Sequence, residues 1–183
     1  TINGIEEADF ILLIGSNPRY EATILNARIR KAYLQNKTKI ISLNDVGDLT
    51  YPYESLDGDI ENIKKITEDN HEVSRLIKEA KKPLIILGQS SLKTKSAKYI
   101  FESIKSFLEK NNKISEEWNS LNIVSENAST VGSFDLGLYK TKDGSNEVLK
   151  DLENHMFEIV YLLGVDNLKF EKKNEFIIYQ GSH

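Results

Sequence analysis

Residues 11–22, ILLIGSNPRYEA, place an apolar run, one glycine and an Asn-Pro step directly before residues with helical spacing. The pattern predicts a strand that ends at Gly15 and a helix that begins at Pro18, with Asn17 as its N-cap. A turn of this kind can bind a phosphate through the N–H groups at the start of its helix. It can equally be a joint that only reverses the chain, so the surrounding sequence has to decide between the two.

The unit of an apolar run, a glycine and a polar turn recurs along the chain. It stands at residues 10–19 (FILLIGSNPR), 83–92 (PLIILGQSSL) and 159–168 (IVYLLGVDNL). Continuous apolar runs are typical of strands that are buried on both faces, as in parallel sheets. Residues 39–44 (KIISLN) and 175–180 (EFIIYQ) have the same length and apolar character without the glycine. We therefore predict five strands of this buried kind.

Helical patterns lie between these runs. Apolar positions at three- and four-residue intervals predict helices over residues 20–34, 73–80, 97–108, 115–131 and 148–152. The alternation of strand and helix predicts an α/β fold with a mostly parallel, Rossmann-like sheet and helices on both faces. Residues 45–68 read as a long connection with one short helix. A second loop-rich region, residues 132–146, divides a main α/β lobe, residues 1–132, from a smaller C-terminal βα portion, residues 133–183.

Composition excludes several classes of function. The chain has 183 residues and a net charge of −4, which argues against nucleic acid or an anionic membrane surface as a partner. Its mean hydropathy is −0.41, and no apolar run approaches the roughly 18 residues of a membrane span, so we expect no direct membrane insertion. The chain has no cysteine, which excludes disulfides and thiolate ligation of zinc or iron–sulfur clusters within it. The three histidines lie far apart, so we predict no metal site.

The candidate ligand loop consists of Gly15, Ser16, Asn17 and Arg19. The backbone N–H groups of Arg19 and Tyr20 are expected to point into the space above the carboxyl edge of the sheet, where anions bind in α/β folds. Against a ligand, the loop has one glycine where dinucleotide-binding loops have three, and a nearby glutamate at position 21 repels phosphate. The residues alone favour a structural joint, and no catalytic residue is predicted anywhere in the chain.

Longer stretches carry a resemblance to a known family. Residues 4–34, GIEEADFILLIGSNPRYEATILNARIRKAYL, resemble the large iron–sulfur subunit of NADH:quinone oxidoreductase (respiratory complex I), which is the 75 kDa subunit in mitochondria and has a direct counterpart in bacteria. The resemblance continues in order through DLTYPYESLDGD, LIKEAKKPLIILGQSSL, WNSLNIV, DLGLY and FIIYQGSH. It implies a fragment of the molybdopterin-oxidoreductase-like C-terminal region of that subunit. The absence of an initiator methionine and an acidic start that does not fit a signal peptide agree with a fragment.

The resemblance also implies what the chain holds and where it works. No cofactor is expected in this fragment, and the iron–sulfur clusters are expected in the N-terminal part of the subunit. Other peripheral-arm subunits of complex I are the implied partners, on the cytoplasmic side of the bacterial inner membrane or the matrix side in mitochondria. In cofactor-binding members of the wider superfamily, a GSNP-like loop contacts the pterin-guanine-dinucleotide, and an Asp-Pro-Arg-like turn after the next strand contacts the nucleotide. This sequence has ISLNDVGD there, with Asn44 in place of the acid and no Pro-Arg.

Three functions remain from the sequence. The first is a structural, non-catalytic domain of this oxidoreductase subunit that supports electron transfer from NADH to quinone. The second is a fragment of a molybdopterin-guanine-dinucleotide-dependent oxidoreductase such as a formate dehydrogenase. The third is a free-standing nucleotide-binding α/β module. The missing Asp-Pro-Arg turn argues against the second, and the single glycine of the loop argues against the third.

Overall fold

A computed structural model describes residues 2–125, 127, 129–137, 147–165 and 168–181. The chain divides into two compact units, Thr1–Val131 and Gly132–His183. The division into a main α/β lobe, residues 1–132, and a smaller C-terminal βα portion of the same region, residues 133–183, stays a prediction. The elements in chain order are η1 (Ile2–Glu7), β1 (Phe10–Ile14), α1 (Pro18–Glu21), α2 (Thr23–Asn36), β2 (Lys39–Leu43), β3 (Glu54–Leu56), α3 (Ile60–Thr67), α4 (Glu72–Glu79), β4 (Pro83–Leu87), α5 (Gln89–Leu92), α6 (Ala97–Lys110), β5 (Leu121–Ile123), α7 (Thr130–Asp135), α8 (Glu147–Glu153), β6 (Ile159–Leu163) and β7 (Phe176–Gln180).

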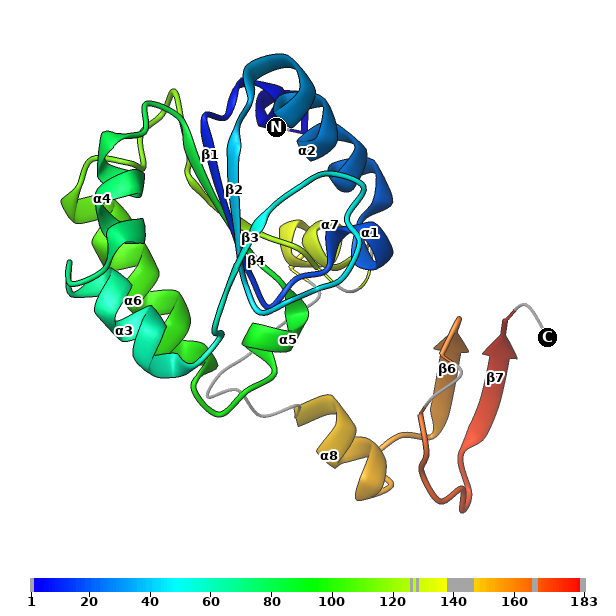
Figure 1. Ribbon diagram of the computed structural model, residues 1–183. Coiled ribbons are helices and arrows are strands. Elements are labelled where there is room, and N and C mark those ends of the chain that lie inside the picture. Colours follow the sequence, from blue (N-terminus) through cyan, green and yellow to red (C-terminus); the bar gives the residue numbers. More distant parts are fainter. Residues whose placement is uncertain (1, 126, 128, 138–146, 166–167, 182–183) are drawn as a thin grey trace. The chain divides into compact units, whose positions relative to one another are not determined.

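The first unit is built on one five-stranded sheet in the order β3-β2-β1-β4-β5. Every neighbouring pair is parallel, and Ile11 of β1 lies opposite Ile40 of β2 on one side and Leu84 of β4 on the other. Figure 1 shows α2 on one face of this sheet and α3, α4 and α6 on the other. The predicted α/β class with a mostly parallel sheet and helices on both faces is confirmed.

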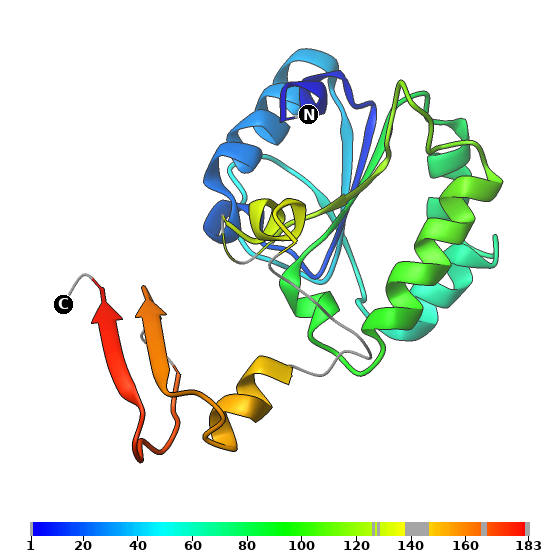
Figure 2. The same cartoon turned by 180° about the vertical axis from the view of Figure 1, so that it is seen from behind.

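Each face of the sheet has its own hydrophobic core, and Figure 2 shows from behind the helices that flank the two faces. Side chains of β1 alternate between them, because successive residues of a strand point to opposite faces. Leu12 packs with Ile85 and Ile104 on the face of α3, α4 and α6. Ile11 packs with Ile29 of α2 on the opposite face. All five residues of β1 and all five of β4 are buried, which confirms for these two strands the prediction of burial on both faces.

Most helices of the first unit were predicted, and one prediction was wrong. Helices α2, α4 and α6 fall on the predicted ranges, and α3 is the short helix expected within the connection 45–68. The helix predicted over residues 115–131 does not form: Ile114 bridges Asn119, Leu121–Ile123 is the edge strand β5, and α7 begins only at Thr130. Residues 126 and 128, part of that prediction, lie outside the described residues. The strand β3 has no counterpart among the predicted strands.

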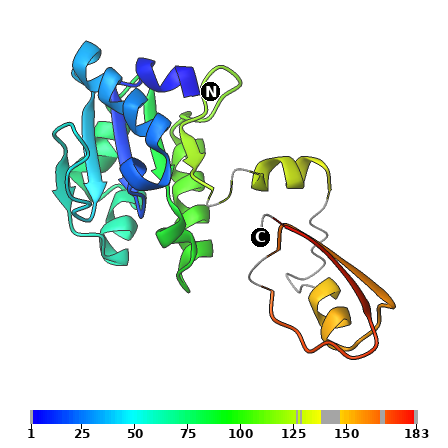
Figure 3. The same ribbon diagram turned by 90° about the vertical axis from the view of Figure 1, so that its right-hand side faces the viewer.

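The second unit contains α8 and a two-stranded parallel sheet, β6-β7, drawn in orange and red in Figure 3. Both strands stand where the sequence predicted them, but the expectation that they are buried on both faces is wrong. Ile159 and Leu163 are each 63% exposed, and Phe176 is 66% exposed. The burial of β6 alternates between exposed and intermediate residues, so only one of its faces is partly covered. Most of the predicted loop region 132–146 lies outside the described residues.

Candidate functional site

The strand order places a topological switch point between β1 and β4. The chain leaves β1 toward α1 and α2 on one face, and it leaves β4 toward α5 and α6 on the other face. Ligands of open α/β sheets bind in the crevice at such a point, outside the carboxyl ends of the strands. The predicted ligand loop, which follows β1, lies at this point.

The two loops at the switch point pack directly against each other. Gly15 has φ +59°, and a Cβ atom there would lie 2.5 Å from the backbone nitrogen of Ser91. A Cβ at Gly88 would collide with the carbonyl oxygen of Gly15 and with Ser16. The hydroxyl of Ser90 donates to the carbonyl oxygen of Gly15 at 2.5 Å. Because neither Gly15 nor Gly88 has a Cβ atom, the loop after β1 and the loop after β4 can pack directly against each other at these two positions.

Asn17 caps the short helix α1 as predicted. Its Oδ1 accepts a hydrogen bond from the backbone N–H of Arg19 at 3.2 Å, and Pro18 occupies the first helical position. The backbone N–H of Tyr20 donates to the carbonyl oxygen of Asn17 at 3.1 Å. The expectation that the N–H groups of Arg19 and Tyr20 point freely into the space above the sheet is therefore wrong. Both N–H groups already donate to Asn17, and an anion bound at the start of this helix would need the same two donors.

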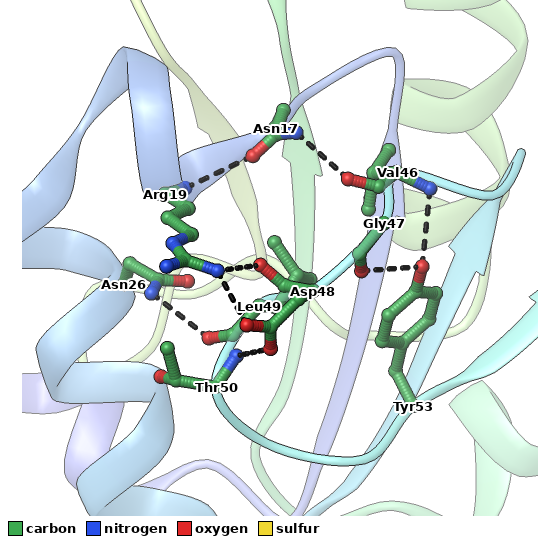
Figure 4. A network of polar contacts seen from close by, with 9 residues as sticks. All are labelled: Asn17, Arg19, Asn26, Val46, Gly47, Asp48, Leu49, Thr50 and Tyr53. Carbon is green, nitrogen blue, oxygen red and sulfur yellow. Dashed lines mark hydrogen bonds and ion pairs between the residues drawn. The ribbon is translucent and has the colours of Figure 1, made fainter.

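The side chains of the loop are held by the connection that follows β2 (Figure 4). Asn17 donates through Nδ2 to the carbonyl oxygen of Val46 at 2.9 Å. Nη1 of Arg19 donates to the carbonyl oxygen of Asp48 at 2.7 Å and forms an ion pair with its carboxylate at 2.6 Å. Ser16, which is 2% exposed, donates from its hydroxyl to the carboxylate of Glu21 at 2.9 Å. The structure thus brings Gly15, Ser16, Asn17 and Arg19 together, each in contact with other parts of this chain.

The electrostatics around the loop are dominated by carboxylates. The backbone N–H of Thr50, followed by the guanidinium of Arg19, lowers the pKa of Asp48. A hydrogen bond from the Tyr53 hydroxyl at 2.6 Å, followed by one from the backbone N–H of Gly47, lowers the pKa of Asp45. Both groups are therefore ionised at neutral pH, and the only cation among the four predicted residues, Arg19, is already neutralised by one of them.

A buried polar link fixes the same connection to α2. Asn26 is 6% exposed and donates through Nδ2 to the carbonyl oxygen of Leu49 at 3.0 Å. Its Oδ1 accepts from the hydroxyl of Tyr51 at 2.8 Å. Burial raises the pKa of Tyr51, with a smaller contribution from Tyr53. This role was not predicted from the sequence, where a polar residue on the apolar stripe of an amphipathic helix was the available signal.

Asn44 stands where cofactor-binding relatives of the wider superfamily are expected to carry an acid. It has φ +95°, and its side-chain oxygen accepts a hydrogen bond from the backbone N–H of Gly58 at 3.1 Å. Its own backbone N–H donates to the carbonyl oxygen of Leu56 at 2.8 Å. The residue thus ties the end of β2 to the end of β3, and its side chain turns to the backbone of this chain.

No group of three or more histidine, aspartate or glutamate side chains suited to a metal ion occurs among the residues that the structure describes. Within the same ranges, no helix has the length and apolar character needed to cross a bilayer.

The fold defines a doubly wound α/β protein, in which the loop after β1 lies at the switch point and is engaged by other residues of the same chain. The model of the molybdopterin oxidoreductase family matches residues 1–183, and the chain belongs to this family. The relationship read from the GSNP stretch and its continuation is thereby confirmed.

Individual relatives refine this relationship. The chain is 40% identical over 181 residues to the NADH-ubiquinone oxidoreductase 75 kDa subunit of Reclinomonas americana, covering 98% of the chain and 26% of the relative. It is 36% identical to the corresponding NADH-quinone oxidoreductase subunit of Rickettsia bellii, covering 100% of the chain and 26% of the relative. It is also 36% identical to the mitochondrial NADH-ubiquinone oxidoreductase 78 kDa subunit of Candida albicans, covering 100% of the chain and 24% of the relative. The chain therefore spans about a quarter of the length of these relatives.

Proposed function

We propose that this chain is a non-catalytic, supporting domain of the large iron–sulfur subunit of an NADH:quinone oxidoreductase. Similarity to the 75 kDa subunit and to its bacterial counterpart over nearly the whole chain supports the subunit. The observation that supports the non-catalytic role is that the side chains of Asn17 and Arg19, both in the switch-point loop, bind Val46 and Asp48 of the same chain. We infer that the role of the loop is structural: it joins β1 to α1 and binds the connection after β2.

The residues at the switch point do not fit the molybdopterin nucleotide that the family name implies. A dinucleotide carries phosphates, and these bind free N–H groups and cations. Here the N–H groups of Arg19 and Tyr20 are used by Asn17, and the guanidinium of Arg19 is paired with Asp48. Ionised Asp45 and Asp48 add negative charge beside it. No reaction step is therefore assigned to such a cofactor in this chain.

The iron–sulfur clusters that pass electrons from NADH toward quinone belong, in this proposal, to the N-terminal part of the subunit, and this chain holds no cofactor. Its partners are the other peripheral-arm subunits of complex I, with no nucleic acid and no direct membrane insertion. The complex lies on the cytoplasmic side of the bacterial inner membrane, or on the matrix side in a mitochondrion. The net charge of −4 supports the exclusion of nucleic acid.

Elemental analysis of the full-length subunit tests the proposal against a molybdopterin-dependent oxidoreductase. We expect iron from the clusters and molybdenum far below one equivalent, because the switch-point residues do not fit the cofactor. A cofactor-loaded formate dehydrogenase, analysed in parallel, provides the positive control. Stoichiometric molybdenum in the subunit would overturn the supporting role.

Two measurements on the pure chain test the remaining alternatives. Calorimetric titration with guanine and adenine nucleotides is expected to give no binding in the micromolar range, and micromolar affinity would favour the nucleotide-binding module. An NADH–ferricyanide assay is expected to give no turnover, because the chain has no cysteine to hold a cluster. Measurable turnover would contradict a non-catalytic domain.

A further inference from the structure

The first unit leaves part of one sheet face open. A groove of about 1210 Å³ runs along the face that carries α2, between η1 and the start of α2 on one side and β5 on the other. Leu84 and Ile86 of β4 form part of its lining and belong to the hydrophobic core of that face. The groove therefore exposes the edge of a core and is not a shallow feature of the polar surface.

The rim of the groove carries large apolar side chains. Ile24 is 66% exposed, Ile123 is 51% exposed and Val131 is 61% exposed, and all three line the groove. Ile2 of η1, which also lines the groove, is 55% exposed. Four β-branched side chains around one depression form an apolar patch that favours burial against another apolar surface.

The charges of the groove are strongly one-sided. Four carboxylates line it, those of Glu7, Glu21, Glu116 and Glu117, against the single ammonium group of Lys82. Lys82 is already engaged: it forms an ion pair with Glu7 and lies 5.3 Å from the ring centroid of Trp118. Glu116 and Glu117 are exposed at the edge of the groove. An occupant with lysine or arginine beside its apolar stripe complements this distribution.

The size of the groove fits one short helix. A helix about 10 Å across rises 1.5 Å per residue, so 1210 Å³ corresponds to about ten residues, or roughly three turns. Parallel sheets are covered by helices on both faces, and here the groove lies between the start of α2 and the β4 and β5 side of the same face. The chain spans about a quarter of its relatives' length, so a longer protein of that kind has ample chain to supply the helix.

We propose that this groove is the docking site of an amphipathic helix of about three turns, with lysine or arginine flanking its apolar stripe, contributed by the same polypeptide outside residues 1–183. An intramolecular helix docks at high effective concentration, which suits a surface that completes a core. The inference rests on the function proposed above in that the chain is part of a longer subunit, and it does not depend on the non-catalytic role, because it concerns how this α/β unit is covered.

Photo-crosslinking in the full-length subunit tests the proposal. Ile123 is replaced by photoreactive p-benzoylphenylalanine, and the crosslinked peptides are identified by mass spectrometry. We expect a crosslink within one polypeptide to a single peptide from outside residues 1–183 that has apolar residues at helical spacing and neighbouring lysine or arginine. The same replacement at Tyr99, which is 43% exposed and lies on α6 of the opposite face, is the control and is expected not to give that peptide. A crosslink from position 123 to another subunit or a second copy, or none at all, would overturn the proposal.

A charge reversal tests the complementarity separately. The double variant Glu116→Lys/Glu117→Lys is expected to lower the yield of the crosslink from position 123 several-fold. Glu102→Lys/Glu109→Lys, which reverses two exposed carboxylates on α6, is expected to leave the yield unchanged. Equal yields in both double variants would refute the basic flank of the proposed helix.

Discussion

The side-chain amide of Asn17 holds two segments of the chain at once: Oδ1 accepts from the N–H of Arg19 at 3.2 Å, and Nδ2 donates to the carbonyl oxygen of Val46 at 2.9 Å. One residue thus caps α1 and fixes the connection after β2. The contact explains how a loop of ligand-binding shape is stabilised by the chain itself. It also makes the stability of the first unit sensitive to changes in this loop.

Asn17→Ala is expected to lower the free energy of unfolding of the first unit by about 1–2 kcal/mol, because it removes a helix cap and a hydrogen bond. Trp118 is the only tryptophan of the chain and lies in this unit, so urea unfolding followed by its fluorescence reports the change. Asn17→Asp keeps the cap acceptor and loses the donor to Val46, so we expect an intermediate loss. The exposed Asn70→Ala is the control. Wild-type stability of Asn17→Ala would show that the loop does not need the contact.

Alanine substitutions at three glycines distinguish the stability cost of backbone strain from the stability cost of steric collision. Gly47 has φ +75° and nothing within 4 Å of an added Cβ, so Gly47→Ala should cost only the left-handed strain, about 1–2 kcal/mol. Gly88→Ala, without positive φ, should cost about 1–3 kcal/mol through its collision with Gly15 and Ser16. Gly15→Ala combines both effects and should be the most destabilising, at about 3 kcal/mol or more. Thermal unfolding ranks the three variants, and Gly15→Ala no worse than Gly47→Ala would contradict the close packing of the two loops.

Tyr51→Phe is expected to destabilise the first unit by about 1–3 kcal/mol, because it leaves Oδ1 of the buried Asn26 without its donor. Tyr20→Phe, at a side chain that is 79% exposed, is the matched control and should be close to neutral. The pH dependence gives a second readout. Burial raises the pKa of Tyr51, so its stabilising contribution is complete below about pH 10, where the phenol of the unfolded chain ionises, and declines as the pH rises further. Wild type should therefore lose stability in alkali more steeply than Tyr51→Phe.

The sequence predicted the parts of the fold that depend on local periodicity. The runs of β1 and β4 are apolar at every position because both faces are covered, and α6 has a complete apolar stripe. The strand β5 was mistaken for a helix because its three residues are too few to show alternation, and its pairing with β4 decides its conformation. The loop residues Gly15 to Arg19 were found from their turn chemistry. The hydrogen bonds of Asn17 and Arg19 to residues 46–48 were not predicted, because contacts between residues about 29 positions apart leave no periodic signal in an irregular connection.

The buried carboxylate of Glu175 makes the second unit sensitive to acid. The residue is 4% exposed, and its carboxylate accepts from the backbone N–H of Lys173 at 2.7 Å and lies 2.6 Å from Nδ1 of His155. Backbone hydrogen bonds, first that of Lys173, and then the His155 side chain lower the pKa of Glu175 to about 2. A lowered pKa means that the stabilisation is present above the unfolded-state value of about 4.3 and is lost as the pH falls toward 2.

Glu175→Gln should therefore destabilise the second unit at neutral pH and flatten its loss of stability between about pH 5 and pH 2. Met156 is the only methionine and lies in this unit, so its methyl resonance reports unfolding there independently of Trp118. The exposed Glu153→Gln provides the control and should keep the wild-type acid profile. A Glu175 carboxyl resonance that titrates near its ordinary pKa, or an acid profile unchanged in Glu175→Gln, would contradict this account of the site.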